Sequence, residues 1–184
     1  MKYVWQHAQE QAQNVLDENW DQSLPVDITR ICLMENVLPL TTSNLPGRLS
    51  GAIVKRADDS QAHAYTNAEE PRIRRRFTLA HELGHYIEQS KLAKNSEFGF
   101  NDDKQDTEFA KGRRKDQRND YFPHEFFADE FAAALLMPES KIEELREEKK
   151  TPSEMARLFD VSVAAVNRRL TNIDRRAKLS SHAE

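Results

Sequence analysis

FTLAHELGHYIEQ, residues 77–89, carries two histidines four positions apart, with a glutamate directly after the first. Residues i and i+4 lie one turn apart on the same face of an α-helix, so His81 and His85 present their imidazoles to one point. Glu82 lies about 100° around the helix from His81, which leaves its carboxylate beside a metal and not on it. The spacing predicts a zinc site in which Glu82 is the general base that accepts a proton from water.

The alternative is an ordinary helix that carries two solvated or satisfied histidines. The motif is surrounded by apolar residues, which favour a buried helix: Phe77, Leu79, Ala80 and Ile87. A buried helix that carries His, Glu and His needs partners for all three polar side chains. Gly84 permits close approach of another backbone. These surroundings favour the metal site.

A catalytic zinc needs a third protein ligand, and no third histidine follows the motif at position 88 or 91. The best candidate is Glu125 in HEFFADEFAAALLM, where Glu125, Ala128, Ala132 and Leu135 form one predicted buried stripe. A carboxylate on such a stripe is costly unless it meets a cation. Two alternatives stay open: Glu125 is a first-turn acid of a helix, or His124 is the ligand, although it projects about 100° away.

Other side chains near the motif have candidate supporting roles. Asp129 lies one turn after Glu125 and is placed to accept the second ring N–H of a metal-binding histidine. Tyr121 and His124 are candidates for stabilising an oxyanion. Two histidines and one carboxylate suit zinc, with manganese as the alternative metal.

The remaining chain predicts several further elements. We expect a helix over 2–20, a helix after Pro25 that ends before Pro39, strands within 48–56 and 62–67, a long polar loop over 90–120, a helix from Pro123 to Pro138, a charged helix near 141–150, two short helices joined near Asp160, and a frayed tail over 175–184.

Composition limits the class of protein. The chain has 184 residues, a length that suggests one domain, or one domain with a small appendage. Its net charge of −4 supplies no overall basic field for nucleic acid. The single cysteine, Cys32, fits a reducing compartment and is expected in the core. Trp5 and Trp20 are expected as core or interface anchors. With no signal peptide and no apolar span, the sequence predicts a soluble cytoplasmic protein.

RRRFTLAHELGHYIE, followed about 40 residues later by EFFADEFAAALLMP, resembles the ImmA/IrrE family of metallo-endopeptidases. The downstream FDVSVAAVNRRL is similar to the small C-terminal helical element of that family, and the resemblance covers residues 2–172. It implies a gluzincin-like zinc site of His81, His85 and Glu125, the last within the pattern ExxAxxFA, with Glu82 as the general base.

The resemblance also implies a fold and a domain order. We expect an α+β fold with a mostly helical zincin-like metallopeptidase domain and a small antiparallel sheet over residues 1–140. A helix-turn-helix-like C-terminal element over 141–176 would pack on this domain, and 177–184 would form a flexible tail.

Members of this family commonly act on a partner repressor with a helix-turn-helix DNA-binding domain. The resemblance therefore implies a zinc-dependent endopeptidase that cleaves or inactivates such an XRE-type repressor and derepresses phage, mobile-element or stress genes. Some members are paired with the regulator in toxin–antitoxin-like operons. No membrane partner is expected.

Two other functions are weighed against proteolysis. The C-terminal helices suggest a DNA-binding regulator, and so do the nearby arginines Arg168, Arg169, Arg175 and Arg176. A packing appendage with a basic surface is favoured, because DNA-recognition helices normally lie in more basic domains. A module that sequesters the repressor without cutting it does not require Glu82, so the intact motif argues against it.

Two further stretches have open interpretations. AHAYTN, residues 62–67, is either an edge strand that pairs with an extended substrate or a plain strand of the sheet. The arginines of 72–76 are expected to form ion pairs and surface charge at the start of the helix, with Glu69 and Glu70 as partners.

Overall fold

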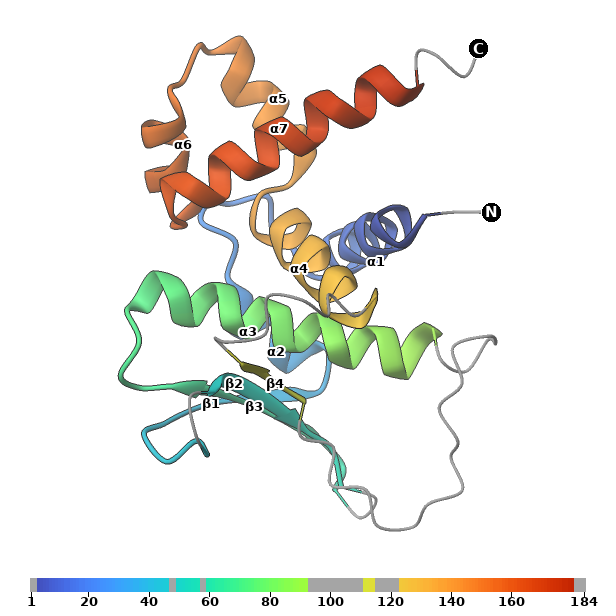
Figure 1. The fold of residues 1–184 in the computed structure, drawn as a ribbon, viewed down its shortest axis with the longest axis vertical. Helices are drawn as coiled ribbons and strands as arrows, with labels where there is room; N and C mark the ends of the chain where they lie inside the picture. Colours follow the sequence, from blue (N-terminus) through green and yellow to red (C-terminus); the bar gives the residue numbers. More distant parts are fainter. Residues whose placement is uncertain (1–2, 47–48, 57–58, 93–110, 115–122, 181–184) are drawn as a thin grey trace.

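The computed structural model of the chain describes residues 3–46, 49–56, 59–92, 111–114 and 123–180. Its fold is α+β, as predicted, with helices stacked on one small sheet (Figure 1). The helices are α1 (Val4–Asn19), α2 (Ile28–Met34), α3 (Arg72–Ile87), the π-helix η1 (Glu88–Leu92), α4 (Pro123–Leu136), α5 (Glu139–Glu147), α6 (Pro152–Phe159) and α7 (Val163–Ser180). The strands are β1 (Val37–Thr42), β2 (Leu49–Val54), β3 (Ala62–Asn67) and β4 (Lys111–Arg114).

The sheet has the strand order β1-β3-β2-β4. β2 runs antiparallel to both of its neighbours, β3 and β4, but β1 runs parallel to β3. The sheet is therefore mixed, and the prediction of an antiparallel sheet holds for three strands but not for β1.

The strand β1 differs from the sequence expectation, which places Val37 and Leu38 at the end of a helix and assigns no element to residues 39–42. α2 ends at Met34, and Asn36 has a φ of 60°, a left-handed conformation that asparagine tolerates well and that turns the chain into β1. Pro39 lies inside the strand. A proline cannot donate to a strand ladder, and it is tolerated here because β1 is an edge strand among the strands that the structure describes.

The helices are layered on the sheet (Figure 1). α3 crosses the sheet over β2 and β3, and α4 packs on the other side of α3, beside α1. A Cβ added at Gly84 of α3 would lie 3.1 Å from the Cα of Ala128 of α4. The missing side chain at Gly84 therefore brings the two backbones together, as the sequence suggested.

The C-terminal helices form the layer beyond α4 (Figure 1). α6 begins with a capping box between Thr151 and Glu154, and Asp160 adopts a left-handed conformation that ends it. α7 is longer than the predicted short helix. It has 18 residues and continues through much of the predicted tail to Ser180. Ile173 and Arg176 are buried, so packing supports the extra turns. Residues 181–184 lie outside the described residues.

The arginines at the start of α3 reach the C-terminal layer. Arg72 lies 2.5 Å from a carboxylate oxygen of Asp160, and Nε of Arg76 lies 3.2 Å from the other oxygen. Arg74 pairs with Glu70 at 3.7 Å. The prediction of ion pairs therefore holds, but the principal partner is Asp160, 84 to 88 positions away, which ties α3 to the turn between α6 and α7.

Several smaller expectations also have an outcome. Cys32 is buried, and burial raises the pKa of its thiol to about 12. Trp5 lies under the guanidinium of Arg176, 4.5 Å from ring centroid to Cζ, and Trp20 packs against the core. The polar stretch 90–120 contains β4. Its residues 93–110 and 115–120 lie outside the described residues. No helix among the described residues is long and apolar enough to cross a membrane.

Candidate metal centre

The helix α3 carries both histidines and the glutamate of the motif. His81, Glu82 and His85 are all buried, each with at most 1% of its surface exposed. α3 begins at Arg72, directly after Pro71, and so extends five residues before the stretch that marked it in the sequence. It ends two residues after His85, where η1 begins. The motif therefore lies in the second half of a 16-residue helix that is packed on both sides.

α4 adds a carboxylate to the two imidazoles. Nε2 of His81 and Nε2 of His85 are 3.1 Å apart. The two carboxylate oxygens of Glu125 lie 3.3 Å from these nitrogens, one oxygen from each. The structure therefore brings together the three residues that the sequence proposed as metal ligands.

The separations in this cluster provide a test of whether a metal fits. Ligand atoms placed about 2.0–2.1 Å from a tetrahedral zinc ion lie about 3.3–3.4 Å from one another. The two imidazole nitrogens are 3.1 Å apart, and each lies 3.3 Å from a different oxygen of Glu125. One ligand atom from each of the three residues lies within 4.8 Å of the others, which is close to this requirement. The side chain of Glu125 is 31% exposed, so the cluster opens toward solvent on that side. The residues present fit zinc with an accessible position.

The burial of Glu125 differs from the sequence expectation of a fully buried stripe. Ala128, Ala132 and Leu135 are buried as expected, whereas Glu125 is only partly covered. The deeply buried acid of α4 is Glu130, which the sequence analysis did not single out.

Asp129 contacts His81 on the side of the imidazole that faces away from Glu125. Its Oδ1 lies 3.0 Å from Nδ1 of His81, the ring nitrogen that faces away from Glu125. This contact favours the tautomer that presents Nε2 to a metal. Burial alone would lower the pKa of His81, but hydrogen bonds with Asp129 and Glu125 and the charge of Glu82 raise it to about 9.

The histidines also stabilise the charge of Glu125. Burial raises the pKa of this carboxyl, and hydrogen bonds with His81 and His85 lower it more, so its pKa falls well below the ordinary value. These contacts favour the charged carboxylate of Glu125 and the protonated form of His81. Metal ligation requires neutral imidazole, so metal entry would displace a proton from His81.

Glu82 lies against the sheet. A Cβ added at Gly51 in β2 would lie 3.0 Å from Oε1 of Glu82 and 2.4 Å from Cγ2 of Thr78. Gly51 therefore makes room for the candidate base, a role that the sequence analysis missed. The available signal was a glycine inside a strand pattern, which often marks close approach of another group.

The two oxyanion candidates have different outcomes. His124 lies next to Glu125 on α4, and its Nδ1 is 2.9 Å from Oε1 of Glu88 at the start of η1. This pair connects the end of the motif helix to the start of the helix that carries the third candidate ligand. Tyr121 lies outside the described residues.

The strand AHAYTN is not a sheet edge. It forms β3, which is paired with β1 on one side and with β2 on the other. Its backbone groups are engaged by these neighbours, so the suggestion that this strand pairs with an extended substrate is wrong. Among the described strands, the edge next to β2 is β4.

Two of the four arginines that suggested DNA binding are buried. Arg176 lies 2.7 Å from Oε2 of Glu130, and Arg169 donates to the backbone carbonyl of Met137 at 3.4 Å. These contacts hold α7 on α4, which is the packing role that the sequence analysis favoured for this region. Arg168 and Arg175 are exposed.

Comparison with known proteins connects this geometry to a family. The model of the family Peptidase_M78, described as the IrrE N-terminal-like domain, matches residues 59–171, a range that includes α3, α4 and the whole cluster. None of the curated proteins matches the chain. Among solved structures, a Mycobacterium tuberculosis transcriptional regulator is similar, with a TM-score of 0.53 and 13% sequence identity. The match covers 91% of this chain and 46% of that one, so the chain spans about half of the regulator's length. At this identity the likeness shows the fold alone.

Proposed function

The chain belongs to the IrrE N-terminal-like domain family, Peptidase_M78, and on this premise we propose that it is a zinc-dependent endopeptidase. The observation that carries the proposal is the cluster of His81, His85 and Glu125, in which one ligand atom from each residue lies within 4.8 Å of the others. Glu82 is buried next to these residues on α3. Zinc is the metal that this donor set suits best, with manganese as the alternative.

Each residue of the centre then has a defined task. When bound, zinc supplies a Lewis acid that polarises a scissile carbonyl and lowers the pKa of water to about 7. Glu82 accepts the proton from water and later delivers it to the leaving amine. Asp129 orients His81. The exposed side of Glu125 leaves a path for substrate, and the edge strand β4 is the described strand next to β2 with which an extended substrate could pair.

The proposed substrate is a partner repressor with a helix-turn-helix domain. The motifs RRRFTLAHELGHYIE and EFFADEFAAALLMP support this, because the family that they resemble commonly acts on such repressors. Cleavage or inactivation would derepress phage, mobile-element or stress genes. The retained Glu82 favours proteolysis over sequestration alone, since binding without cleavage needs no general base.

The variant Glu82→Gln tests the mechanism. The substitution keeps the shape of the side chain and removes the base, so we expect zinc content to be unchanged and cleavage to fall by on the order of 10²–10⁴-fold. Zinc is measured by mass spectrometry, and cleavage is measured on purified repressor proteins that carry a helix-turn-helix domain. Undiminished cleavage in the variant would reject Glu82 as the base. Binding of such a repressor by zinc-loaded wild type without any cleavage would favour the sequestering alternative.

A further inference from the structure

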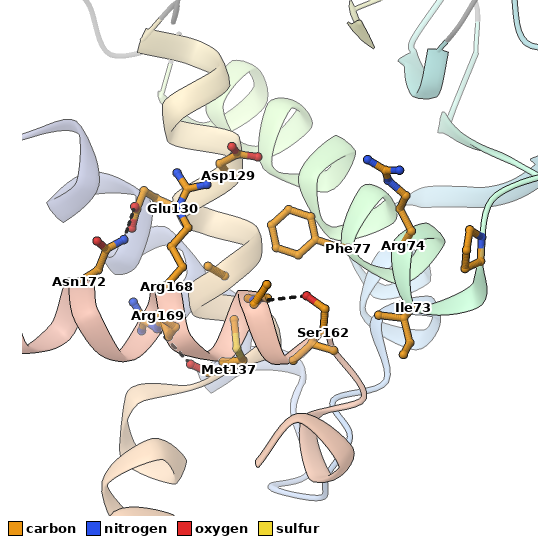
Figure 2. Close-up of a pocket in the computed structure, with 15 residues that line it drawn as sticks. Ile73, Arg74, Phe77, Asp129, Glu130, Met137, Ser162, Arg168, Arg169 and Asn172 are labelled. Carbon is orange, nitrogen blue, oxygen red and sulfur yellow. Dashed lines mark hydrogen bonds between the residues drawn. The ribbon is translucent and has the colours of Figure 1, made fainter. Parts of the chain in front are cut away.

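A groove of about 450 Å³ lies between the first half of α3, the second half of α4 and the start of α7 (Figure 2). This volume is within the range of about 300–1,000 Å³ that ligand sites occupy. Most of its lining is apolar, and the main residues are Ile73, Phe77, Ala133, Met137, Val161 and Ala165. The metal mechanism uses none of these side chains.

The acids in the wall of the groove are already paired. Glu130 lies 2.7 Å from Arg176 and accepts a hydrogen bond from Asn172 at 3.2 Å. Asp129 contacts His81 at 3.0 Å. Arg176 offsets the charge of Glu130, and Asp129 is turned toward His81, so the exposed charges at the opening of the groove are those of the arginines at its rim.

The rim is basic. Arg74 on α3 has 56% of its side chain exposed and reaches Glu70 only at 3.7 Å. Arg168 on α7 is also exposed. Figure 2 shows these two arginines on opposite sides of Phe77, one at each side of the apolar floor. An occupant with an apolar side chain and an adjacent acid matches this arrangement in shape and in charge.

One residue connects the groove to the metal centre. Asp129 lines the groove and also contacts Nδ1 of His81, so the groove reaches the side of this imidazole that faces away from Glu125. Its far end carries exposed apolar surface, since Ile73 is 40% exposed and Val163, next to Ser162 in the lining, is 43% exposed. An apolar surface that continues beyond the groove suits a polypeptide better than a small molecule, which would be enclosed.

We propose that this groove docks a segment of the protein substrate in which an apolar residue is followed by an acidic one. The inference rests on the proposed function and adds to it a substrate preference and the surface that produces it. The apolar side chain would occupy the floor over Phe77, and the carboxylate would lie between Arg74 and Arg168.

The test measures binding without catalysis. Zinc-loaded Glu82→Gln is titrated into two fluorescein-labelled ten-residue peptides, which differ only in whether a central leucine is followed by glutamate or by lysine. We expect the glutamate peptide to bind about fivefold more tightly, as for a partly exposed ion pair. Adding Arg74→Glu should reverse the preference, whereas the matched exposed arginine of α6, in Arg157→Glu, should leave it unchanged. Equal binding of the two peptides, or no effect of Arg74→Glu, would overturn the proposal.

A second variant tests the floor. Ala133→Phe fills the groove and should weaken the binding of both peptides, with zinc content as the check that the centre is intact. If this variant does not fold, the charge reversal at Arg74 decides alone. Displacement of the glutamate peptide by an equal concentration of decanoate would reject a polypeptide occupant in favour of a small amphipathic acid. Because the base is absent throughout, docking can be confirmed even if wild type cuts no peptide, and cleavage can be confirmed even if docking fails.

Discussion

Asp129 and Glu130 are consecutive acids on α4, and they serve two different clusters. Asp129 lies 3.0 Å from His81 in the candidate metal centre. Glu130 lies 2.7 Å from Arg176 and joins α4 to α7. Both contacts bring a carboxylate of one helix to a nitrogen base of another, yet the partners differ in chemistry.

The difference between the partners distinguishes the candidate metal cluster from the structural ion pair. Neutral imidazole has a lone pair that can bind a metal, whereas a guanidinium is always charged and can only donate hydrogen bonds. The two clusters also differ in exposure. The side chain of Glu125, in the candidate metal cluster, is 31% exposed, whereas that of Glu130, in the ion pair with Arg176, is only 5% exposed. The centre proposed for catalysis is open to solvent on one side, and the ion pair that holds α7 is closed.

Loss of a metal ligand should have the largest effect on zinc binding. A matched substitution in the structural ion pair should leave zinc binding unchanged. We expect Glu125→Ala to weaken zinc binding by on the order of 10³-fold, since it removes one of three protein ligands. Glu130→Ala should keep wild-type zinc content while lowering the free energy of unfolding. Metal content after gel filtration and denaturant titration measure the two effects. Zinc retained in Glu125→Ala would identify a different third ligand.

Breaking the structural cluster should cost stability without loss of metal. Arg176→Met leaves Glu130 buried without its main cation, so we expect the free energy of unfolding to fall by about 3–5 kcal/mol. The neighbouring exposed arginine supplies the control, since Arg175→Met should change stability by less than about 0.5 kcal/mol. Urea unfolding followed by circular dichroism measures both. Similar stabilities for the two variants would show that the ion pair contributes little.

Removal of the orienting acid should have an intermediate effect. We expect Asp129→Ala to reduce zinc affinity about 10- to 100-fold, because His81 loses the partner of its Nδ1, while saturating zinc still fills the site. Competition with a zinc chelator gives the affinity. Wild-type affinity in this variant would mean that packing in α3 alone orients the imidazole.

The smallest effect is expected at the exposed link between α3 and Asp160. Arg72 is largely exposed, and Arg76 still pairs with Asp160 when Arg72 is removed. We therefore expect Arg72→Ala to change the free energy of unfolding by less than about 1 kcal/mol, with zinc content unchanged. Thermal unfolding measures this. A larger loss would show that the two arginines hold the turn cooperatively.

The helical part of the centre was predictable because it depends on local geometry. His81, Glu82 and His85 have their relative directions set by the 3.6-residue helical period, which needs no knowledge of the rest of the chain. Glu125 lies 40 positions after His85, and its pairing with the histidines was inferred from the apolar pattern around it and from the family resemblance. The structure places it within 3.3 Å of both imidazoles.

The features missed in the sequence depend on contacts between distant segments. Gly51 is a glycine inside a strand pattern, which indicates that some group approaches closely, but that this group is Glu82 follows only from the packing of α3 on β2. Strand β1 was hidden because Pro39 suggests a break, and a proline is acceptable in a strand only when that strand lies at an edge.

The sequence by itself indicated the α+β class, the motif helix and the candidate metal ligands. Only the tertiary structure decided which charged residues of α4 and α7 face each other. Asp129 and Glu130 are adjacent and chemically alike, and Arg168 and Arg169 are identical neighbours. Successive residues on a helix point about 100° apart, so the positions of the packed neighbours decide which member of each pair is buried and which is exposed.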